Sequence, residues 1–349
     1  MKIRAFITHK QAEAFADCQD RFGVNCDTKS IALSDGMGST WQQKIWAQLL
    51  VDTFIESHDW LPTHDSIKPL CDSWQIKVKN FIKDLKDTNA PENLIYRNER
   101  NLIAGVSAGA TFVGIRFKEQ KWKGSVLGDS CLIEWNENHA TFYTSQEGES
   151  FDNYPDYFDS SIIKKGKGTP KEIEGLMAKG TCLFLVSDPF SEFLLEQDKQ
   201  QDLAKYINQL LAISSHEEFE KVVEEWRKAG MHNDDTTLVI IEHNDFDAFL
   251  IEHEDNIKEF IDLEKKGNKK EDSIELPGTK ESENGEASLD GVNTHEYIEP
   301  SAFIEEFFKE YYTITNKKYK VYKLTFQINK NNIKTALTNL FDKYSIIRK

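Results

Sequence analysis

The sequence predicts an α+β fold, and two observations support this prediction. Residues 108–144 contain β-prone runs separated by short turns, which is typical of antiparallel strands. Apolar residues recur with a helical period in four other segments, namely 41–57, 67–85, 203–213 and 217–228. The chain has 349 residues, of which 39% are hydrophobic, and this is enough for one large domain with its own core plus an appendage.

The first hundred residues predict strands followed by helices. In chain order we expect a strand at 2–8, a loop at 11–25, a buried strand at 30–35, helices at 41–57 and 67–85, and a short helix that begins near Pro91. Proline is tolerated in the first turn of a helix, because the N–H that it lacks would have no helical partner there. The buried strand leads directly into a turn that contains Asp35 and Gly36.

The rest of the large domain predicts more strands and two further helices. We expect strands at 108–117, 122–126, 131–135 and 140–144 joined as an antiparallel meander, a polar surface flap with short helices at 145–170, a strand at 180–188, helices at 203–213 and 217–228, and a last strand at 238–241. Gly230 is placed to end the second of these helices, because glycine readily adopts the left-handed conformation that follows many helices.

Charge and cysteine content argue against several classes of protein. The net charge is −16, and a surface this acidic repels nucleic acids and anionic membranes. Residues 1–10 lack the apolar run of a signal peptide, and no stretch reaches the roughly 18 apolar residues of a spanning helix. The five cysteines form no Cys-x-x-Cys pair, so we expect free thiols and a cytoplasmic protein.

The composition changes after about residue 245 and divides the chain into four parts. Residues 1–245 form the large domain, and residues 246–263 predict a charged helical extension. Residues 264–299 contain few large apolar side chains and predict a flexible linker. Residues 300–349 recover apolar content and predict a small α/β module. Because so few residues build only a limited core, we expect this module to bind a protein partner.

Four aspartates lie next to predicted strands, and their pattern indicates a metal site. Asp35 and Asp188 follow strands, Asp234 precedes one, and Asp129 lies at the end of another. Antiparallel neighbours would bring such residues to one edge of a sheet, where carboxylates repel one another unless cations neutralise them. Oxygen donors of this kind suit Mg²⁺ or Mn²⁺ rather than zinc. One such aspartate alone would more simply be a turn or N-cap residue.

Six short motifs contain these aspartates or lie between them. In chain order they are Cys18-Gln19-Asp20, Asp35-Gly36-Met37-Gly38-Ser39, Ala108-Gly109-Ala110-Thr111, Gly128-Asp129-Ser130, Ser187-Asp188 and Asp234-Asp235-Thr236-Thr237. Together they resemble the type 2C family of metal-dependent serine/threonine protein phosphatases, particularly its bacterial branch. The second motif is similar to the family's Asp-Gly-Met-Gly-Gly, and the last to its Asp-Asn-x-Thr. The resemblance covers roughly residues 1–243.

The resemblance implies a four-layer α-β-β-α sandwich of two antiparallel sheets flanked by helices, with a two-metal centre at one end. The implied ligands of two Mn²⁺ or Mg²⁺ ions are Asp35, Gly36 through its carbonyl, Asp188, Asp234, Asp20 and Asp129. Asp35 would bridge both ions, Asp20 would act mainly through bound water, and Asp129 would help to hold a weaker third ion. Asp35, Asp188 and Asp234 would be the catalytic residues.

The implied reaction is the hydrolysis of phosphoserine and phosphothreonine in proteins, by a water or hydroxide that the two ions share. The implied partners are a phosphoprotein substrate and a cognate serine/threonine kinase. The motifs imply neither a nucleic-acid nor a membrane partner.

The sequence departs from the family pattern at three positions. Gln19 stands where many relatives have glutamate, and Pro189 replaces a glycine, so that the local turn should differ. Phe15 occupies the approximate place of a phosphate-binding arginine, for which Lys10 or Arg21 would have to substitute. These departures leave open a second interpretation, in which a phosphatase-fold protein with little or no activity acts as a binding or regulatory module.

Other catalytic residues find less support in the sequence. Residues 105–109 match Gly-x-Ser-x-Gly, but a nucleophile elbow requires a helix after the serine, and a β-prone run follows here. His9 and His232 are the histidines nearest to the six motifs, and we expect both to be structural or solvent-facing.

Overall fold

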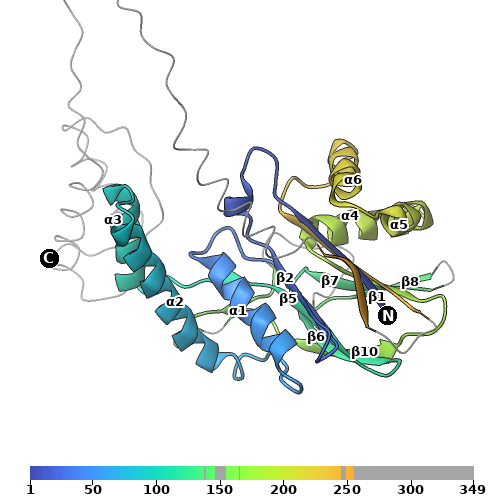
Figure 1. Cartoon of the computed structure of the whole chain (residues 1–349), viewed down its shortest axis with the longest axis horizontal. Coiled ribbons are helices and arrows are strands. Elements are labelled where there is room, and N and C mark those ends of the chain that lie inside the picture. The colour runs from blue at the N-terminus through green and yellow to red at the C-terminus, as the bar shows by residue number, and fades with distance from the viewer. Residues whose placement is uncertain (137–138, 146–154, 165, 245–248, 255–349) are drawn as a thin grey trace, which may run out of the picture. The chain divides into compact units, whose positions relative to one another are not determined.

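Two large β-sheets form the centre of the computed structural model, which describes residues 1–136, 139–145, 155–164, 166–244 and 249–254 (Figure 1). The first sheet has the order β13-β1-β12-β11-β7-β8, and the second has the order β10-β6-β5-β3-β2. The strands of the first sheet are β1 (Lys2–Thr8), β7 (Cys131–Asn136), β8 (His139–Tyr143), β11 (Cys182–Val186), β12 (Thr236–Glu242) and β13 (Leu250–Glu254). Those of the second are β2 (Arg21–Asn25), β3 (Ser30–Ser34), β5 (Phe112–Lys118), β6 (Lys121–Leu127) and β10 (Lys171–Leu176). A short pair, β4 (Gly109–Ala110) and β9 (Phe158–Asp159), lies apart from both.

Central strands of the first sheet are buried on both faces, because side chains alternate along a strand. In β1, Ile3 belongs to an apolar cluster that residues of both sheets form, whereas Phe6 belongs to a cluster on the opposite face. In β11, Leu185 and Phe184 divide in the same way. Consecutive positions of these strands are therefore apolar, which explains the apolar run in the predicted strand at 180–188.

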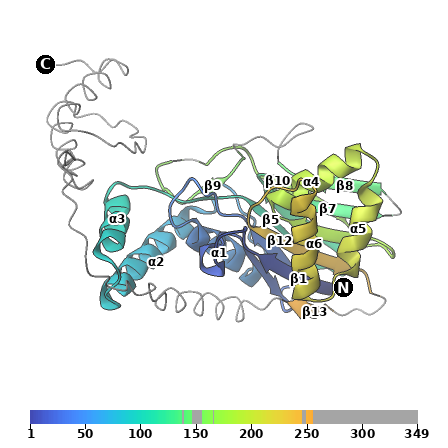
Figure 2. The same ribbon diagram turned by 90° about the horizontal axis from the view of Figure 1, so that it is seen from above.

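Helices cover the outer face of each sheet (Figures 1 and 2). On the second sheet packs α1 (Gln43–Glu56), followed outward by α2 (Lys68–Asp87) and α3 (Glu92–Ile103). On the first sheet pack α4 (Asp188–Lys199), α5 (Leu203–Ala212) and α6 (His216–Lys228). Phe54 of α1 meets Phe112 of β5 at a ring-centroid distance of 5.4 Å, inside a third apolar cluster. In the described part of the chain, no helix has the length and apolar character needed to span a membrane.

Within residues 1–245 and outside the flap, the five predicted helices are confirmed, as α1, α2, α3, α5 and α6. Pro91 is the N-cap of α3, one position before the first helical turn. Gly230 follows α6 with a φ of +110°, the left-handed conformation expected of it.

The predicted meander over residues 108–144 is wrong, because the chain changes sheet in the middle of it. β5 pairs with β6 and β7 pairs with β8, but β6 belongs to the second sheet and β7 to the first. The change takes place at residues 128–130, where Gly128 has a φ of +101°. The Gly128-Asp129-Ser130 motif therefore connects the two sheets.

The loop predicted for residues 11–25 is also wrong in its second half. It contains a short 3₁₀ helix, Phe15–Asp17, and then β2, which pairs with β3 along its whole length. The described residues of the predicted flap at 145–170 contain the two-residue strand β9 and no helix.

The helical extension predicted for residues 246–263 is wrong where the structure describes it. Leu250–Glu254 form β13, which pairs in parallel with the open edge of β1. Phe249 and Ile251 pack against the cluster between the sheets, so tertiary contacts outweigh the local helical pattern. The predicted linker at 264–299 and the predicted module at 300–349 lie outside the described residues.

Gly128→Ala is expected to lower the free energy of unfolding by about 1–3 kcal/mol. A Cβ on Gly128 would lie 2.7 Å from the carbonyl oxygen of Asp156 and 2.7 Å from Thr111 Cβ, besides the strain of a positive φ. Gly230→Ala is the matched control, since its φ is also positive and a Cβ there would meet no described atom within 4 Å. Urea denaturation compares the two variants, and equal losses would contradict the crowding argument.

Candidate metal centre

Asp20 and Asp35 lie side by side at one end of the second sheet. Arg21 pairs with Ser34 in the β2–β3 register, so the residue before β2 and the residue after β3 are neighbours. The backbone of Asp35 is further held by Thr111, whose N–H donates to the Asp35 carbonyl at 2.9 Å. The backbone N–H of Asp35 donates in turn to Thr111 Oγ1 at 3.3 Å. The ends of β2 and β3 and the residue before β5 therefore position the first two aspartates of the site.

Asp129, Asp188 and Asp234 lie next to strand ends of the first sheet, all at the same end of that sheet. Val186, the last residue of β11, pairs with the first residue of β7 and with the third residue of β12. The residues that precede β7, follow β11 and precede β12 are consequently close in space. The four aspartates of the antiparallel argument, and Asp20 from the family resemblance, therefore lie next to strand ends. They belong to two sheets, however, and not to one sheet edge as predicted.

A buried polar contact joins the two sheets at this end. Asp20 is 0% exposed, and its Oδ2 accepts a hydrogen bond from Thr237 Oγ1 at 2.7 Å. Thr237 belongs to β12, and its backbone N–H donates to Ser187 Oγ at 2.9 Å. A carboxylate that precedes a strand of one sheet is therefore oriented by hydroxyl groups of the other.

Asp188 is the first residue of α4, a helix that the sequence analysis did not predict. Ser187 is its N-cap, and the N–H of Ser191 donates to the Ser187 carbonyl at 3.1 Å. Pro189 lies in the first helical turn, where a missing N–H costs no hydrogen bond. The expected distortion at Pro189 is thus replaced by a regular helix start. The positive end of the helix dipole also favours an acidic residue in this turn.

Ser191 connects the segments of Asp188 and Asp129. Its Oγ lies 3.0 Å from the carbonyl oxygen of Asp188 and 2.8 Å from that of Asp129. Asp129 is 6% exposed and lies directly after the sheet-changing turn. The next residue, Ser130, places its Oγ 2.6 Å from Thr111 Oγ1, beside Asp35. Small hydroxyl side chains therefore fill the space behind the aspartates.

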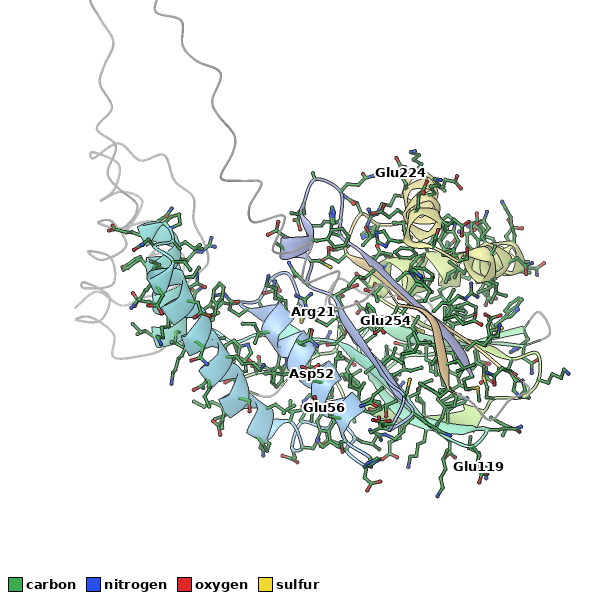
Figure 3. All side chains as sticks on the ribbon, in the orientation of Figure 1. Arg21, Asp52, Glu56, Glu119, Glu224 and Glu254 are labelled. Atoms are coloured by element: carbon green, nitrogen blue, oxygen red, sulfur yellow. The ribbon has the colours of Figure 1, made fainter. Side chains whose placement is uncertain are left out.

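Asp234 lies next to one of the two cations that the sequence proposed for phosphate binding. Its side chain is 49% exposed, and Lys10 Nζ lies 3.7 Å from its Oδ1. Arg21, at the start of β2 (Figure 3), instead donates to the carbonyl oxygens of Cys18 at 3.0 Å and Asp20 at 2.6 Å. Lys10 is therefore better placed than Arg21 to meet a phosphate at this end of the sheets.

The two histidines nearest to the motifs have ordinary surroundings. His9 Nδ1 lies 2.8 Å from the carbonyl oxygen of Lys10, and its ring packs edge-on against Phe15 at 4.6 Å. His232 is exposed. Neither placement indicates a general acid.

Asp235 is a site residue that the sequence analysis missed. It is 3% exposed, and its two oxygens accept hydrogen bonds from the backbone N–H groups of Lys10 at 3.0 Å and Gln19 at 2.7 Å. Asp235 thus closes the loop between β1 and β2 and places Asp20 at the end of it. The sequence could not predict these hydrogen bonds, because both partners of Asp235 are more than 200 residues away along the chain.

Asp235→Ala is expected to lower the free energy of unfolding by about 1–3 kcal/mol, because two partly buried N–H groups lose their acceptor. Asp235→Asn should cost less, since its one remaining side-chain oxygen keeps one of the two hydrogen bonds. Thermal unfolding with chelator present measures both variants. Equal stability of the Ala and Asn variants would contradict the acceptor role.

Burial and mutual repulsion raise the pKa of several carboxyls at this end. Burial is the largest cause, and for Asp20, where the charge of Asp235 is the second cause, the pKa rises to about 7. The pKa of Asp35 rises well above its usual range, first by burial and then through the charge of Asp20. That of Asp188 rises similarly, by burial and then through Asp129. Carboxylates from both sheets therefore act on one another, and a cation would relieve the repulsion.

Asp20 tests whether the donors fit a divalent cation. Its buried Oδ1 has no hydrogen-bond partner among the described residues, and an unsatisfied buried carboxylate oxygen is costly. Hard cations such as Mg²⁺ and Mn²⁺ prefer oxygen donors of this kind. Within the described ranges, however, no three His, Cys, Asp or Glu side chains are already arranged around a common ion position. The donor set therefore fits such a cation in kind.

The turn at Gly36 has no room for a side chain. A Cβ there would lie 2.9 Å from Gln43 Cγ and 3.0 Å from the carbonyl oxygen of Gln19. Gly36 also forms an isolated bridge with Ala110. The residue after Asp35 is therefore glycine because α1 and the Asp20 loop both approach its backbone closely.

Comparison with known proteins gives matches among solved structures only. No protein-family model matches the chain, and no curated relative matches it. Stp1 from Staphylococcus aureus, a serine/threonine phosphatase, is 15% identical, with 69% of this chain and 94% of that chain covered and a TM-score of 0.45. The S. agalactiae serine/threonine phosphatase is 13% identical, with 69% of this chain and 99% of that chain covered and a TM-score of 0.42. The catalytic domain of the serine/threonine phosphatase PstP, in complex with two manganese ions, is 14% identical, with 68% of this chain and 96% of that chain covered and a TM-score of 0.40.

These solved structures are phosphatases of the kind that the six motifs resemble. Because the identities are this low and the TM-scores are below 0.5, the function proposed next depends on the residues of this chain alone.

Proposed function

We propose that the chain is a metal-dependent phosphatase that hydrolyses phosphoserine and phosphothreonine in proteins. The observation that carries the proposal is the set of aspartates at one end of the two sheets, where burial and like charges raise the pKa of Asp20, Asp35 and Asp188. Buried like charges are costly, and a fold that places them together gains from a cation that neutralises them.

The chain's residues would divide the work at this site. The proposed ligands of two Mn²⁺ or Mg²⁺ ions, with a weaker third, are Asp35, Gly36 through its carbonyl, Asp188, Asp234, Asp20 and Asp129. Such ions, when bound, supply an activated water and neutralise charge on phosphoryl oxygens. Thr237 and Asp235 would keep Asp20 in place from the side of the first sheet. Lys10 would offer the phosphate a positive charge at the exposed rim.

We also propose that the architecture is the four-layer α-β-β-α sandwich of the type 2C family. Support comes from the three apolar clusters, of which one lies between the sheets and the other two lie between a sheet and its helices. In such a sandwich, an end formed by both sheets can collect ligands from both, as the Asp20–Thr237 contact does here.

A second candidate function is a binding or regulatory module with this fold. Two observations favour it: the absence, among the described residues, of three side chains already arranged around an ion, and the position of Lys10 beside Asp234. A lysine that neutralises Asp234 competes with any cation for that carboxylate.

One experiment separates the two candidates. The full chain is incubated with p-nitrophenyl phosphate and with a phosphothreonine peptide, with Mn²⁺ or with EDTA, and Mn²⁺ binding is followed by calorimetry. The phosphatase proposal expects Mn²⁺-dependent hydrolysis of both substrates that EDTA abolishes. Mn²⁺ binding without hydrolysis would favour the regulatory module. If the chain shows no Mn²⁺ binding and no hydrolysis, the metal-centre proposal is overturned.

A further inference from the structure

Arg227, in the last turn of α6, holds two strand ends together beside the aspartates. Its Nη1 and Nη2 donate to the carbonyl oxygen of His9 at 3.4 and 3.3 Å. Nη2 also donates to the carbonyl oxygen of Asp234 at 2.6 Å and to Thr236 Oγ1 at 3.1 Å. His9 directly follows β1, and Asp234 lies just before β12. One guanidinium therefore fixes the chain on both sides of the β1–β12 pair, where a proposed metal ligand is attached.

The helix that carries this guanidinium is itself firmly packed. Trp226 lies edge-on to the ring of Phe190 at 5.3 Å and stacks on the ring of Phe193 at 5.1 Å. Both phenylalanines belong to α4, which begins at Asp188. Two proposed ligands, Asp188 and Asp234, are thus positioned from the same pair of packed helices. The outer side of α6 carries charged residues such as Glu224 (Figure 3).

By its charge alone, Arg227 would weaken the binding of a cation at the aspartates. Any favourable contribution of Arg227 to the site must therefore come from its geometry. The charges of Asp235 and Asp234 act on the guanidinium, and a fixed cation near carboxylates disfavours a second cation. Its hydrogen bond to Asp234, however, goes to the backbone carbonyl, so that it fixes the chain and not the carboxylate. An arginine fork suits this task, because several donors in one plane reach several acceptors at once.

Arg4 provides a matched comparison at the far end of the same two strands. Its Nη1 donates to the carbonyl oxygens of Leu211, at 3.1 Å, and Ile213, and its Nη2 pairs with Glu242 at 2.7 Å. Like Arg227, it joins the β1–β12 pair to the helical layer. Its hydrogen-bond partners Leu211, Ile213 and Glu242 lie outside the segments that carry the proposed ligands.

We propose that Arg227 is a positioning residue for the metal centre: its fork fixes the backbone of Asp234 against β1 and so holds the segment that carries this proposed ligand at the end of the sheet. The proposal extends the proposed function and rests on it for the identity of the ion.

The test compares Arg227→Lys with Arg4→Lys in the full chain by two measurements. Hydrogen exchange of the metal-free proteins reports the backbone, and calorimetry reports Mn²⁺ affinity. Arg227→Lys is expected to increase exchange at the amides of Lys10 and Asp235 and to weaken Mn²⁺ binding about tenfold. Arg4→Lys should increase exchange near Ile213 and leave Mn²⁺ affinity unchanged. Because lysine keeps the charge, any loss of affinity reports geometry.

Each remaining outcome has a definite meaning. Unchanged Mn²⁺ affinity in Arg227→Lys, or an equal loss in Arg4→Lys, would overturn the positioning role. If the wild-type chain binds no Mn²⁺, the proposed function fails, and hydrogen exchange alone decides whether Arg227 fixes the Asp234 segment. Unchanged exchange at Lys10 and Asp235 would then reject the positioning role as well.

Discussion

Replacing Asp35 with asparagine is expected to lower Mn²⁺-dependent hydrolysis by at least about 10²–10³-fold while leaving the metal-free fold as stable as before, or more stable. Asp35 lies between Asp20 and the start of β5, and its pKa is raised by burial and then by the charges of Asp20 and Asp188. Its negative charge therefore opposes folding, and under the proposed function it would serve cation binding. Asparagine keeps the shape and removes that charge.

Asp52→Asn is the control for this prediction. Asp52 lies on α1 (Figure 3), and burial raises its pKa too, but the charges that act on it come from Glu56 and Lys77. The Asp52 variant should keep wild-type activity. Activity on a phosphothreonine peptide and the thermal midpoint with EDTA present are measured for both. Full activity in Asp35→Asn would remove this residue from the centre of the mechanism, and a large loss of metal-free stability would show that its charge supports the fold.

The site could be predicted in outline because its residues lie at the ends of apolar strands. Asp35 follows three apolar residues and a serine, and Asp188 follows five apolar residues and a serine. A strand of that composition must be buried. The partners of these aspartates could not be predicted. Thr237 and Asp20 are separated by 217 residues, and only the pairing of the strands makes one the hydrogen-bond donor of the other.

The missed elements have physical explanations of different kinds. For α4, local signals were present, with Ser187 as N-cap, Pro189 in the first turn, and apolar Phe190 and Phe193 three positions apart. These signals do not predict α4 by themselves, because a proline directly after Asp188 is equally compatible with a distorted turn. For β13, no local signal could suffice, since its strand form depends on the unpaired edge of β1. The change of sheet at Gly128 is equally hidden, because strand alternation does not say which sheet a strand joins.

Without metal, the protein is expected to become less stable as the pH rises. The pKa of Asp20 is raised from 3.8 to about 7 in the fold. Between about pH 4 and pH 7 the folded chain therefore binds more protons at this carboxyl than the unfolded chain does. The stability that protonated Asp20 contributes is fully present below about pH 4 and is lost as the pH rises through about 7. The raised pKa values of Asp35 and Asp188 act in the same direction.

Urea denaturation in EDTA at about pH 5 and about pH 8 measures this effect, and a loss on the order of a few kcal/mol is expected at the higher pH. Asp20→Asn should reduce the difference between the two pH values, because asparagine does not titrate. Mn²⁺ should restore stability mainly at the higher pH, since cations bind the deprotonated carboxylates of the folded chain and protons compete with them. Equal midpoints at both pH values in the metal-free wild type would mean that the charges of these aspartates are already compensated within the fold. The argument for a cation at this end of the sheets would then lose its basis.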